Sequence, residues 1–269
     1  MIELSLTDGH RLTPFFQHTY DSCAESFLQG VMGRGFCDHL TNPTYGIIVL
    51  GEYCYLGGNP STLQLPDDLQ NVLDTVNLSH PHFVPLSALW KQYFQHHPTF
   101  QAKTRYALQK PTLHNFDKEI LITYATKTAY DADYSANTLQ RDFILKPIDE
   151  HYFSLVQQSD WSRDFTCNYT DFHTFNQNGL GFLIIDQKTK QPVAGASSYS
   201  SSLDSIELSL ATSPDYRKRG FATSVSARMV LECLNRGKIP CWDAANPTSL
   251  AIAKKLGYQF FTEYIGYIF

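Results

Sequence analysis

The chain has 269 residues, of which 43% are hydrophobic and 17% charged, and its formal net charge is −5 at pH 7. This composition is typical of a globular protein with one large or two small domains, and the acidic balance argues against a surface that coats nucleic acid. The clearest apolar run, at residues 46–50, is too short to cross a membrane, and the N-terminus lacks the basic and apolar regions of a signal peptide. We expect a cytoplasmic protein that binds neither nucleic acid nor a membrane.

The first half of the chain, residues 1–137, is predicted to be a mixed α/β region. Its spacing of apolar residues predicts helices at 23–31, 67–76 and 86–95, and strands at 45–50, 52–56 and 102–108. The small, polar stretch at residues 131–137 predicts a linker, and hence domains 1–137 and 138–269. No internal repeat is visible in the sequence.

The second half shows a clearer alternation of strands and helices. Strands are predicted at 143–146, 181–185, 192–200, 206–212 and 239–243, with helices beginning near Asp149 and after residue 220. The second of these helices is expected to end at Gly237. The segment 161–175 is aromatic and polar and has no clear period.

The most distinctive stretch, residues 214–222, joins an apolar strand to a helix and reads Pro-Asp-Tyr-Arg-Lys-Arg-Gly-Phe-Ala. A basic turn at a helix N-terminus binds anions, because free backbone N–H groups and the positive end of the helix dipole face it. Gly220 lets the backbone approach the anion, since it has no Cβ. We therefore predict a pyrophosphate-binding turn, with a solvated basic turn as the alternative.

Two blocks of sequence carry a resemblance to a known family. Arg217-x-x-Gly220-x-Ala222 resembles the Arg/Gln-x-x-Gly-x-Gly/Ala signature of the GCN5-related N-acetyltransferases (GNAT), which bind acetyl-CoA. Residues 246–258 are similar to a later block of that superfamily, in which an Asn precedes a short helix that ends in Lys-Leu-Gly-aromatic. The residues between the blocks resemble a branch that has an extra N-terminal region and includes zwittermicin A-resistance-type acetyltransferases. The resemblance covers residues 143–269.

The resemblance implies an α/β fold, with a mixed, splayed sheet flanked by helices over residues 138–269. It also implies an acetyl-CoA-dependent N-acetyltransferase whose N-terminal region shapes the substrate site or is a degenerate acetyltransferase-like half. The cofactor-binding residues that it implies are Leu210, Ala211 and Thr212 along the strand, Arg217, Lys218, Arg219, Gly220, Phe221, Ala222 and Thr223 in the turn and helix start, and Asn246 and Ser249 beyond the gap.

Acetyl transfer to an amine needs a group that takes the amine's proton. Glu207 lies on the strand that superfamily members often use for such a base, and the alternative is a surface carboxylate paired with a neighbour. Asp243, beside Trp242 at the end of the next strand, either binds a cationic substrate or caps the following turn through its side chain.

One position departs from the family pattern. Many members carry a Tyr, which protonates the leaving thiolate, where this chain has Ala253. Another Tyr, Ser249 or a water must then serve, or the thiolate leaves unassisted. This departure keeps open a non-catalytic acetyl-CoA-binding or sensing module.

The cysteines and histidines show no metal-binding spacing, so no metal is expected. No cysteine is placed as an acyl carrier, which favours direct transfer to an amine in a ternary complex. The expected acceptor is a small-molecule amine, with polyamine and antibiotic-like compounds as candidates, and the expected protein is a monomer or homodimer. A nucleotide-phosphate binder that uses the same turn is a further alternative.

Overall fold

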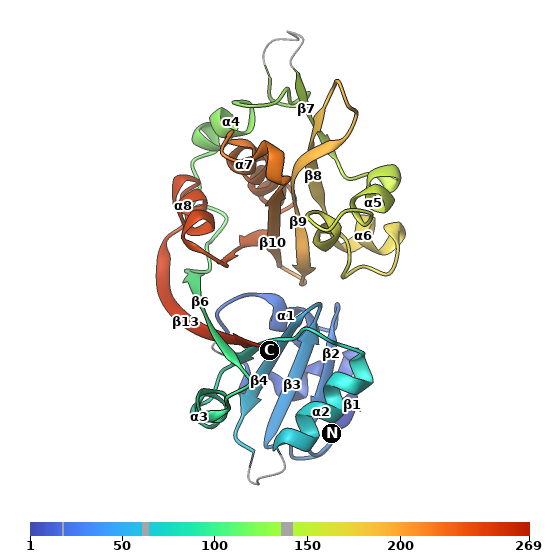
Figure 1. Cartoon of the computed structure of the whole chain (residues 1–269), viewed down its shortest axis with the longest axis vertical. Coiled ribbons are helices and arrows are strands. Elements are labelled where there is room, and N and C mark those ends of the chain that lie inside the picture. Colours follow the sequence, from blue (N-terminus) through green and yellow to red (C-terminus); the bar gives the residue numbers. More distant parts are fainter. Residues whose placement is uncertain (18, 61–64, 136–141) are drawn as a thin grey trace.

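The structure, a computed structural model, describes residues 1–269 except 18, 61–64 and 136–141. It contains two β-sheets flanked by helices, in two lobes that long strands connect (Figure 1). The predicted mixed α/β fold class is therefore confirmed. No helix within the described ranges is long and apolar enough to cross a membrane.

The first sheet has eight strands in the order β1-β2-β3-β4-β5-β13-β6-β12. These strands are β1 (Ile2–Leu4), β2 (Arg34–Cys37), β3 (Tyr45–Leu50), β4 (Tyr53–Gly58), β5 (His82–Pro85), β6 (Gln101–Leu108), β12 (Asp243–Ala244) and β13 (Phe260–Ile268). The helices of this lobe are η1 (Leu6–Phe15), α1 (Cys23–Leu28), α2 (Leu65–Val76) and α3 (Ala88–His96). Trp90 and Phe94 of α3 pack into one buried cluster with the strands, and Phe27 of α1 lies in another.

The second sheet has five strands in the order β11-β10-β9-β8-β7. These are β7 (Phe143–Pro147), β8 (Gly181–Asp186), β9 (Pro192–Ser201), β10 (Ser205–Thr212) and β11 (Ile239–Cys241). The remaining helices are α4 (Lys118–Ala125), α5 (Glu150–Val156), η2 (Arg163–Phe165), α6 (Phe172–Asn178), η3 (Pro214–Tyr216), α7 (Phe221–Asn235) and α8 (Pro247–Lys255). Helix α7 is buried because it packs between this sheet and α4. The hydroxyl of Ser224 on α7 donates a hydrogen bond to the Tyr124 carbonyl of α4 (2.5 Å).

The two halves of the chain repeat one order of elements, which the sequence did not reveal. Strands β2, β3 and β4 are antiparallel, and β4 pairs in parallel with β5 after α2. Likewise β8, β9 and β10 are antiparallel, and β10 pairs in parallel with β11 after α7. The last strands of the two halves, β6 and β13, pair with each other, and β13 lies between β5 and β6 (Figure 1). The end of the second half therefore completes the first sheet.

The two parallel strand pairs, β4–β5 and β10–β11, differ in how far along the strands the pairing extends. The β4–β5 ladder runs from Tyr53 to Leu56, close to the end of β4, whereas the β10–β11 ladder stops at Glu207. Beyond Glu207, and within the part of the chain that the structure describes, β10 pairs only with β9, as far as Thr212. After β11 the chain continues into β12, which pairs with β6 of the first half. A gap therefore opens beside the C-terminal part of β10, as expected for a splayed sheet.

The boundaries of three predicted segments need correction. The strand predicted at 239–243 is two strands, because Ile239–Cys241 pairs with β10 whereas Asp243–Ala244 pairs with β6 in the other sheet. The helix predicted at residues 23–31 ends at Leu28, because Gly30 follows with a φ of +75°, which does not continue a right-handed helix. The predicted linker at 131–137 begins with Asp131, which is 3% exposed and pairs with Arg228 of α7 (Nε–Oδ2 3.1 Å). The predicted domain boundary between residues 137 and 138 lies outside the described residues.

Replacing Arg228 with methionine is expected to lower the free energy of unfolding by about 3–5 kcal/mol, because Asp131 would stay buried without a cation. Arg228 is 4% exposed and also pairs with Asp133 and Glu232. The matched control is Arg236→Met, since Arg236 pairs with the same Glu232 but is half exposed. That control should cost no more than about 1 kcal/mol in urea unfolding, and equal losses for both variants would contradict the role of burial.

Candidate active site

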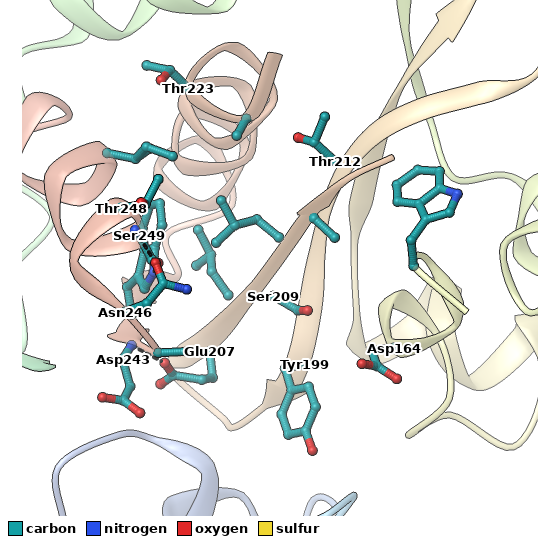
Figure 2. Close-up of a pocket in the computed structure, with 18 of the residues that line it drawn as sticks. Asp164, Tyr199, Glu207, Ser209, Thr212, Thr223, Asp243, Asn246, Thr248 and Ser249 are labelled. Atoms are coloured by element: carbon teal, nitrogen blue, oxygen red, sulfur yellow. Dashed lines mark hydrogen bonds between the residues drawn. The ribbon is translucent and has the colours of Figure 1, made fainter. Parts of the chain in front are cut away.

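One cavity of about 1000 Å³ follows the gap beside β10 and reaches residues of the first half. All residues predicted from the sequence to bind cofactor or substrate, or to act as the base, line this cavity. They are Glu207, Leu210, Ala211, Thr212, Arg217, Lys218, Arg219, Gly220, Phe221, Ala222, Thr223, Trp242, Asp243, Asn246 and Ser249. Figure 2 shows Glu207, Ser209 and Thr212 on the β10 side and Asn246, Thr248 and Ser249 on the α8 side.

The basic turn forms one end of the cavity. Gly220 is the N-cap of α7 and has a φ of +85°, a conformation that side chains disfavour. The first bond of the helix runs from Ser224 N–H to Gly220 O (3.1 Å), which leaves the N–H groups of residues 221–223 without intrahelical acceptors. The side chains of Arg217, Lys218 and Arg219 are exposed around them. Free N–H groups, a helix N-terminus and three cations suit an anionic group such as a pyrophosphate.

The two long walls of the cavity are the free edge of β10 and the first turn of α8. Among the described residues, the edge of β10 beyond Glu207 has no strand partner opposite β9, so its backbone groups face the cavity. On the other wall, Asn246 caps α8, because its Oδ1 accepts the Ser249 N–H at 2.9 Å. Pro247 follows at the first helical position, which suits its fixed φ. This cap holds the start of α8 opposite β10.

Glu207 lies where β10 and β11 part, and it is 4% exposed. Its Oε2 accepts bonds from the Ser22 N–H (3.0 Å) and the Ser22 hydroxyl (2.8 Å), and its Oε1 accepts the Asp243 N–H (2.8 Å). The alternative of a surface carboxylate is therefore wrong. A carboxylate accepts about four hydrogen bonds, so one acceptor position is left for a substrate proton or a water.

Burial, together with the nearby carboxylate of Asp21, raises the pKa of Glu207 to about 8. Asp21 is half-buried, and desolvation and the Asp243 carboxylate raise its pKa to about 6. Asp21 accepts bonds from the Tyr55 hydroxyl (2.7 Å) and the Cys23 N–H (2.9 Å). A carboxyl group whose pKa lies near neutral is suited to take and release a proton.

Asp243 does not cap the following turn, because its carboxylate is held elsewhere. Its Oδ2 accepts bonds from Arg105 Nε (2.6 Å) and the Tyr264 hydroxyl (2.8 Å). Burial raises the pKa of Asp243, and the Arg105 guanidinium opposes that rise. The other oxygen, Oδ1, is buried without a hydrogen-bond partner among the described residues. Trp242 is 3% exposed, and its indole N–H donates to Ser249 Oγ at 3.1 Å.

The sequence did not identify the part of the cavity that the first half contributes. That part contains carboxylates, aromatic rings and one arginine, namely Asp21, Cys23, Glu52, Tyr53, Tyr55 and Arg105. Trp161, Asp164 and Tyr199 of the second half also line the cavity. No local signal marked the residues of the first half, because they reach Glu207 through the pairing of β6 with β12 and the packing of α1 on β9.

Replacing Ser22 with alanine is expected to raise the pKa of Glu207 by about one unit. If Glu207 is the base, the pH at which activity rises should then shift upward by about one unit, so the acidic limb of the pH–rate profile moves to higher pH. The hydroxyl stabilises the ionised form of Glu207, and a hydrogen bond to a charged group is worth about 1.5–3 kcal/mol, or one to two pKa units. Ser26→Ala is the matched control, since Ser26 lies on α1, the helix that Ser22 precedes, and donates to Ser201 O rather than to Glu207. An unchanged limb in Ser22→Ala would contradict the assignment of that limb to Glu207.

The comparisons with known proteins agree with this geometry. The family model for GNAT acetyltransferases matches residues 13–267, nearly the whole chain. The chain belongs to the GNAT acetyltransferase family. A crystal structure of a GCN5-related N-acetyltransferase-like protein from Streptococcus suis is similar to this GNAT acetyltransferase, with 30% identity, a TM-score of 0.81 and coverage of 98% of this chain and 99% of that one.

Two further matches are more partial or more distant. An uncharacterized N-acetyltransferase, YdfB of Bacillus subtilis, is 29% identical over 133 residues, which are 48% of this GNAT acetyltransferase. The match covers 49% of the length of that relative, so the chain spans about half of it. A tandem GNAT protein from the clavulanic acid biosynthesis pathway shares the fold, with a TM-score of 0.57, 9% identity and coverage of 98% of this chain and 94% of that one. Among the described residues, no group of three or more His, Cys, Asp and Glu side chains could hold a metal ion.

Proposed function

We propose that this GNAT acetyltransferase transfers an acetyl group from acetyl-CoA directly to an amine of a small molecule. The observation that carries the proposal is the cavity that joins the basic turn at Gly220 to the buried carboxyl of Glu207. The free N–H groups of α7 and the cations of the turn suit the pyrophosphate, and the open edge of β10 suits the pantetheine arm. Glu207 then takes the proton of the attacking amine.

The acceptor is proposed to be a cationic amine, with polyamines and antibiotic-like amines as candidates. The end of the cavity near the first half contains the carboxyl groups of Asp21, Glu52 and Asp164, while the Asp243 carboxylate there is paired with the Arg105 guanidinium. The opposite end carries the basic turn. This separation of charge favours a cation at the acceptor end and an anion at the cofactor end.

The first half is proposed to be a degenerate acetyltransferase-like unit that shapes the acceptor site. Its element order repeats that of the second half, but its parallel strands β4 and β5 stay paired where β10 and β11 separate. The extra N-terminal half and the Trp242-Asp243 pair support a place in the branch that includes zwittermicin A-resistance-type enzymes. The protein is proposed to be cytoplasmic, and a monomer or homodimer.

Thermal unfolding with added ligands tests the cofactor assignment. Acetyl-CoA should raise the midpoint, whereas ATP and NAD at the same concentration should not, because a ligand that binds only the folded state stabilises it. A shift with ATP or NAD and none with acetyl-CoA would favour a nucleotide-phosphate binder. A shift with acetyl-CoA but no CoA release over a broad amine panel would favour a non-catalytic binding module.

A further inference from the structure

We propose that Ser249 is a catalytic residue, whose hydroxyl donates a hydrogen bond to the coenzyme A sulfur as the thiolate leaves. This inference rests on the proposed function and assigns a group to the step for which Ala253 supplies none. It is carried by the hydrogen bonds around Ser249 and by its place on the cavity wall.

The bonds to Ser249 leave its hydroxyl hydrogen free. An indole N–H is a donor only, so the 3.1 Å contact makes Trp242 the donor and Ser249 Oγ the acceptor. The Ser249 backbone N–H is used by the Asn246 cap. In the described part of the chain the hydroxyl has no acceptor of its own, and Ser249 lines the cavity. The hydroxyl is therefore fixed by one bond and able to donate another into the cavity.

Ser249 lies on the wall that faces Glu207. Figure 2 shows Ser249 on α8 and Glu207 on β10, with the cavity between the two elements. The basic turn lies at the far end of β10, and the free edge of this strand leads from Thr212 back toward Glu207. A thioester carried along that edge from the turn reaches the gap between β10 and the first turn of α8.

The position of the missing tyrosine does not face this gap. Ala253 is fully buried, belongs to the core cluster that contains Leu256 and Tyr258, and is not among the lining residues. Ser249 lies one helical turn earlier, where the helix wall meets the cavity. The hydroxyl that replaces the tyrosine is therefore provided by another residue of the same helix.

Three tyrosine hydroxyls of the cavity are engaged or directed elsewhere. The Tyr55 hydroxyl donates to Asp21, and that of Tyr216 donates to Asp186 (2.9 Å). Figure 2 shows the Tyr199 hydroxyl pointing toward the first half and away from α8. Ser209 lies on the β10 side of the cavity, opposite Ser249, and provides a direct comparison.

The step balances without an additional reactant. The amine nitrogen forms a bond to the thioester carbonyl carbon, the carbon–sulfur bond breaks, and the sulfur leaves with the electron pair as a thiolate. The proton of the amine passes to the Glu207 carboxylate. A serine hydroxyl is a much weaker acid than a thiol, so Ser249 keeps its proton and stabilises the thiolate by a charge-assisted hydrogen bond. Water supplies the proton that finally neutralises the thiolate.

The test measures kcat and the ratio of the affinities for CoA and desulfo-CoA, which lacks the sulfur. Ser249→Ala should lower kcat by about 10²- to 10³-fold, the scale of losing one donor to a developing anion, without weakening acetyl-CoA binding. At pH 9, where a thiol of ordinary pKa is ionised, the wild type should bind CoA about tenfold more tightly than desulfo-CoA. In Ser249→Ala this ratio should fall toward one. Ser249→Thr, which keeps the hydroxyl, should retain most of it.

Two controls make the result specific. Thr123→Ala removes an exposed hydroxyl of α4 outside the cavity and should leave both the ratio and kcat unchanged. A wild-type ratio and kcat in Ser249→Ala, or loss of the ratio in Ser209→Ala instead, would overturn the inference while the proposed function stands. If the wild type binds neither CoA nor acetyl-CoA, the proposed function fails, and this inference with it.

Discussion

Replacing Glu207 with glutamine is expected to lower kcat by about 10²- to 10⁴-fold, the usual contribution of a general base, while acetyl-CoA affinity stays within about twofold. The amide has nearly the shape of the carboxylate but cannot take a proton. It also offers only one oxygen to the three donors that Glu207 accepts from Ser22 and Asp243. Steady-state kinetics and calorimetry with acetyl-CoA measure the two quantities separately.

The ionisation of Glu207 also predicts the direction in which activity changes with pH. The pKa of Glu207 is raised to about 8, so the group is mostly protonated at neutral pH and becomes a base as the pH rises. Wild-type activity should therefore climb between about pH 6 and 9, with half of its maximum near pH 8, and Glu207→Gln should lack this limb. Glu263→Gln, an exposed change outside the cavity, should behave as wild type. A retained limb and near-normal kcat in Glu207→Gln would exclude Glu207 as the base.

Replacing Gly220 with aspartate is expected to weaken acetyl-CoA binding at least about 100-fold. The new carboxylate would stand at the N-terminus of α7, where it would repel the phosphates and compete for the N–H groups that would bind them. Its Cβ would also lie 3.2 Å from Thr128 Cγ2, and a φ of +85° strains any side chain. Calorimetric titration with acetyl-CoA measures the loss.

Gly237→Asp is the matched control for that variant. Gly237 follows the other end of α7 and has a φ of +66°, and a Cβ added there would meet no atom within 4 Å. The control therefore introduces the same charge and a similar backbone strain away from the cavity, and acetyl-CoA affinity should be retained. Equal weakening by both variants would point to damage to α7 rather than to a phosphate site at Gly220.

The sequence predicted the second half well because its signals are local. The strand before the turn, the turn itself and α7 follow from apolar alternation, a basic glycine-containing stretch and helical spacing. The Asn246 cap and the Pro247 start likewise agree with the predicted helix at α8. Each of these signals lies within about a dozen residues.

The first half was predicted less completely. Strand β5 (His82–Pro85) has four residues, ends in a proline and is flanked by another, so it resembled a loop. Helix α4 was missed, although Asp117 caps it by accepting the Glu119 and Ile120 N–H groups.

In the second half, strand β13 was missed because its partners, β5 and β6, lie in the first half. Their pairing depends on tertiary contacts that no local pattern records.

In the candidate site, too, local patterns were predicted and contacts between distant segments were not. The predicted cofactor-binding residues fall in two short segments, 210–223 and 246–249, and the predicted residues of both segments line the cavity. The acceptor end depends on Arg105 meeting Asp243 across 138 positions of sequence, and on Ser22 meeting Glu207 across 185. The burial that raises the pKa of Glu207 comes from these distant segments, so the sequence could name the residue but not its environment.

The most direct test of the proposed acetyl transfer measures thiol release from acetyl-CoA over a panel of polyamines, aminoglycoside-like compounds, aminopolyols and amino acids, with acetylated product quantified by mass spectrometry. We predict that at least one cationic amine yields CoA and N-acetylated product in equal amounts with the wild type. Gly220→Asp and Glu207→Gln should each abolish or strongly reduce this yield. Acetyl-CoA binding without product from any amine, or product formation unaffected by both variants, would contradict the proposed transfer.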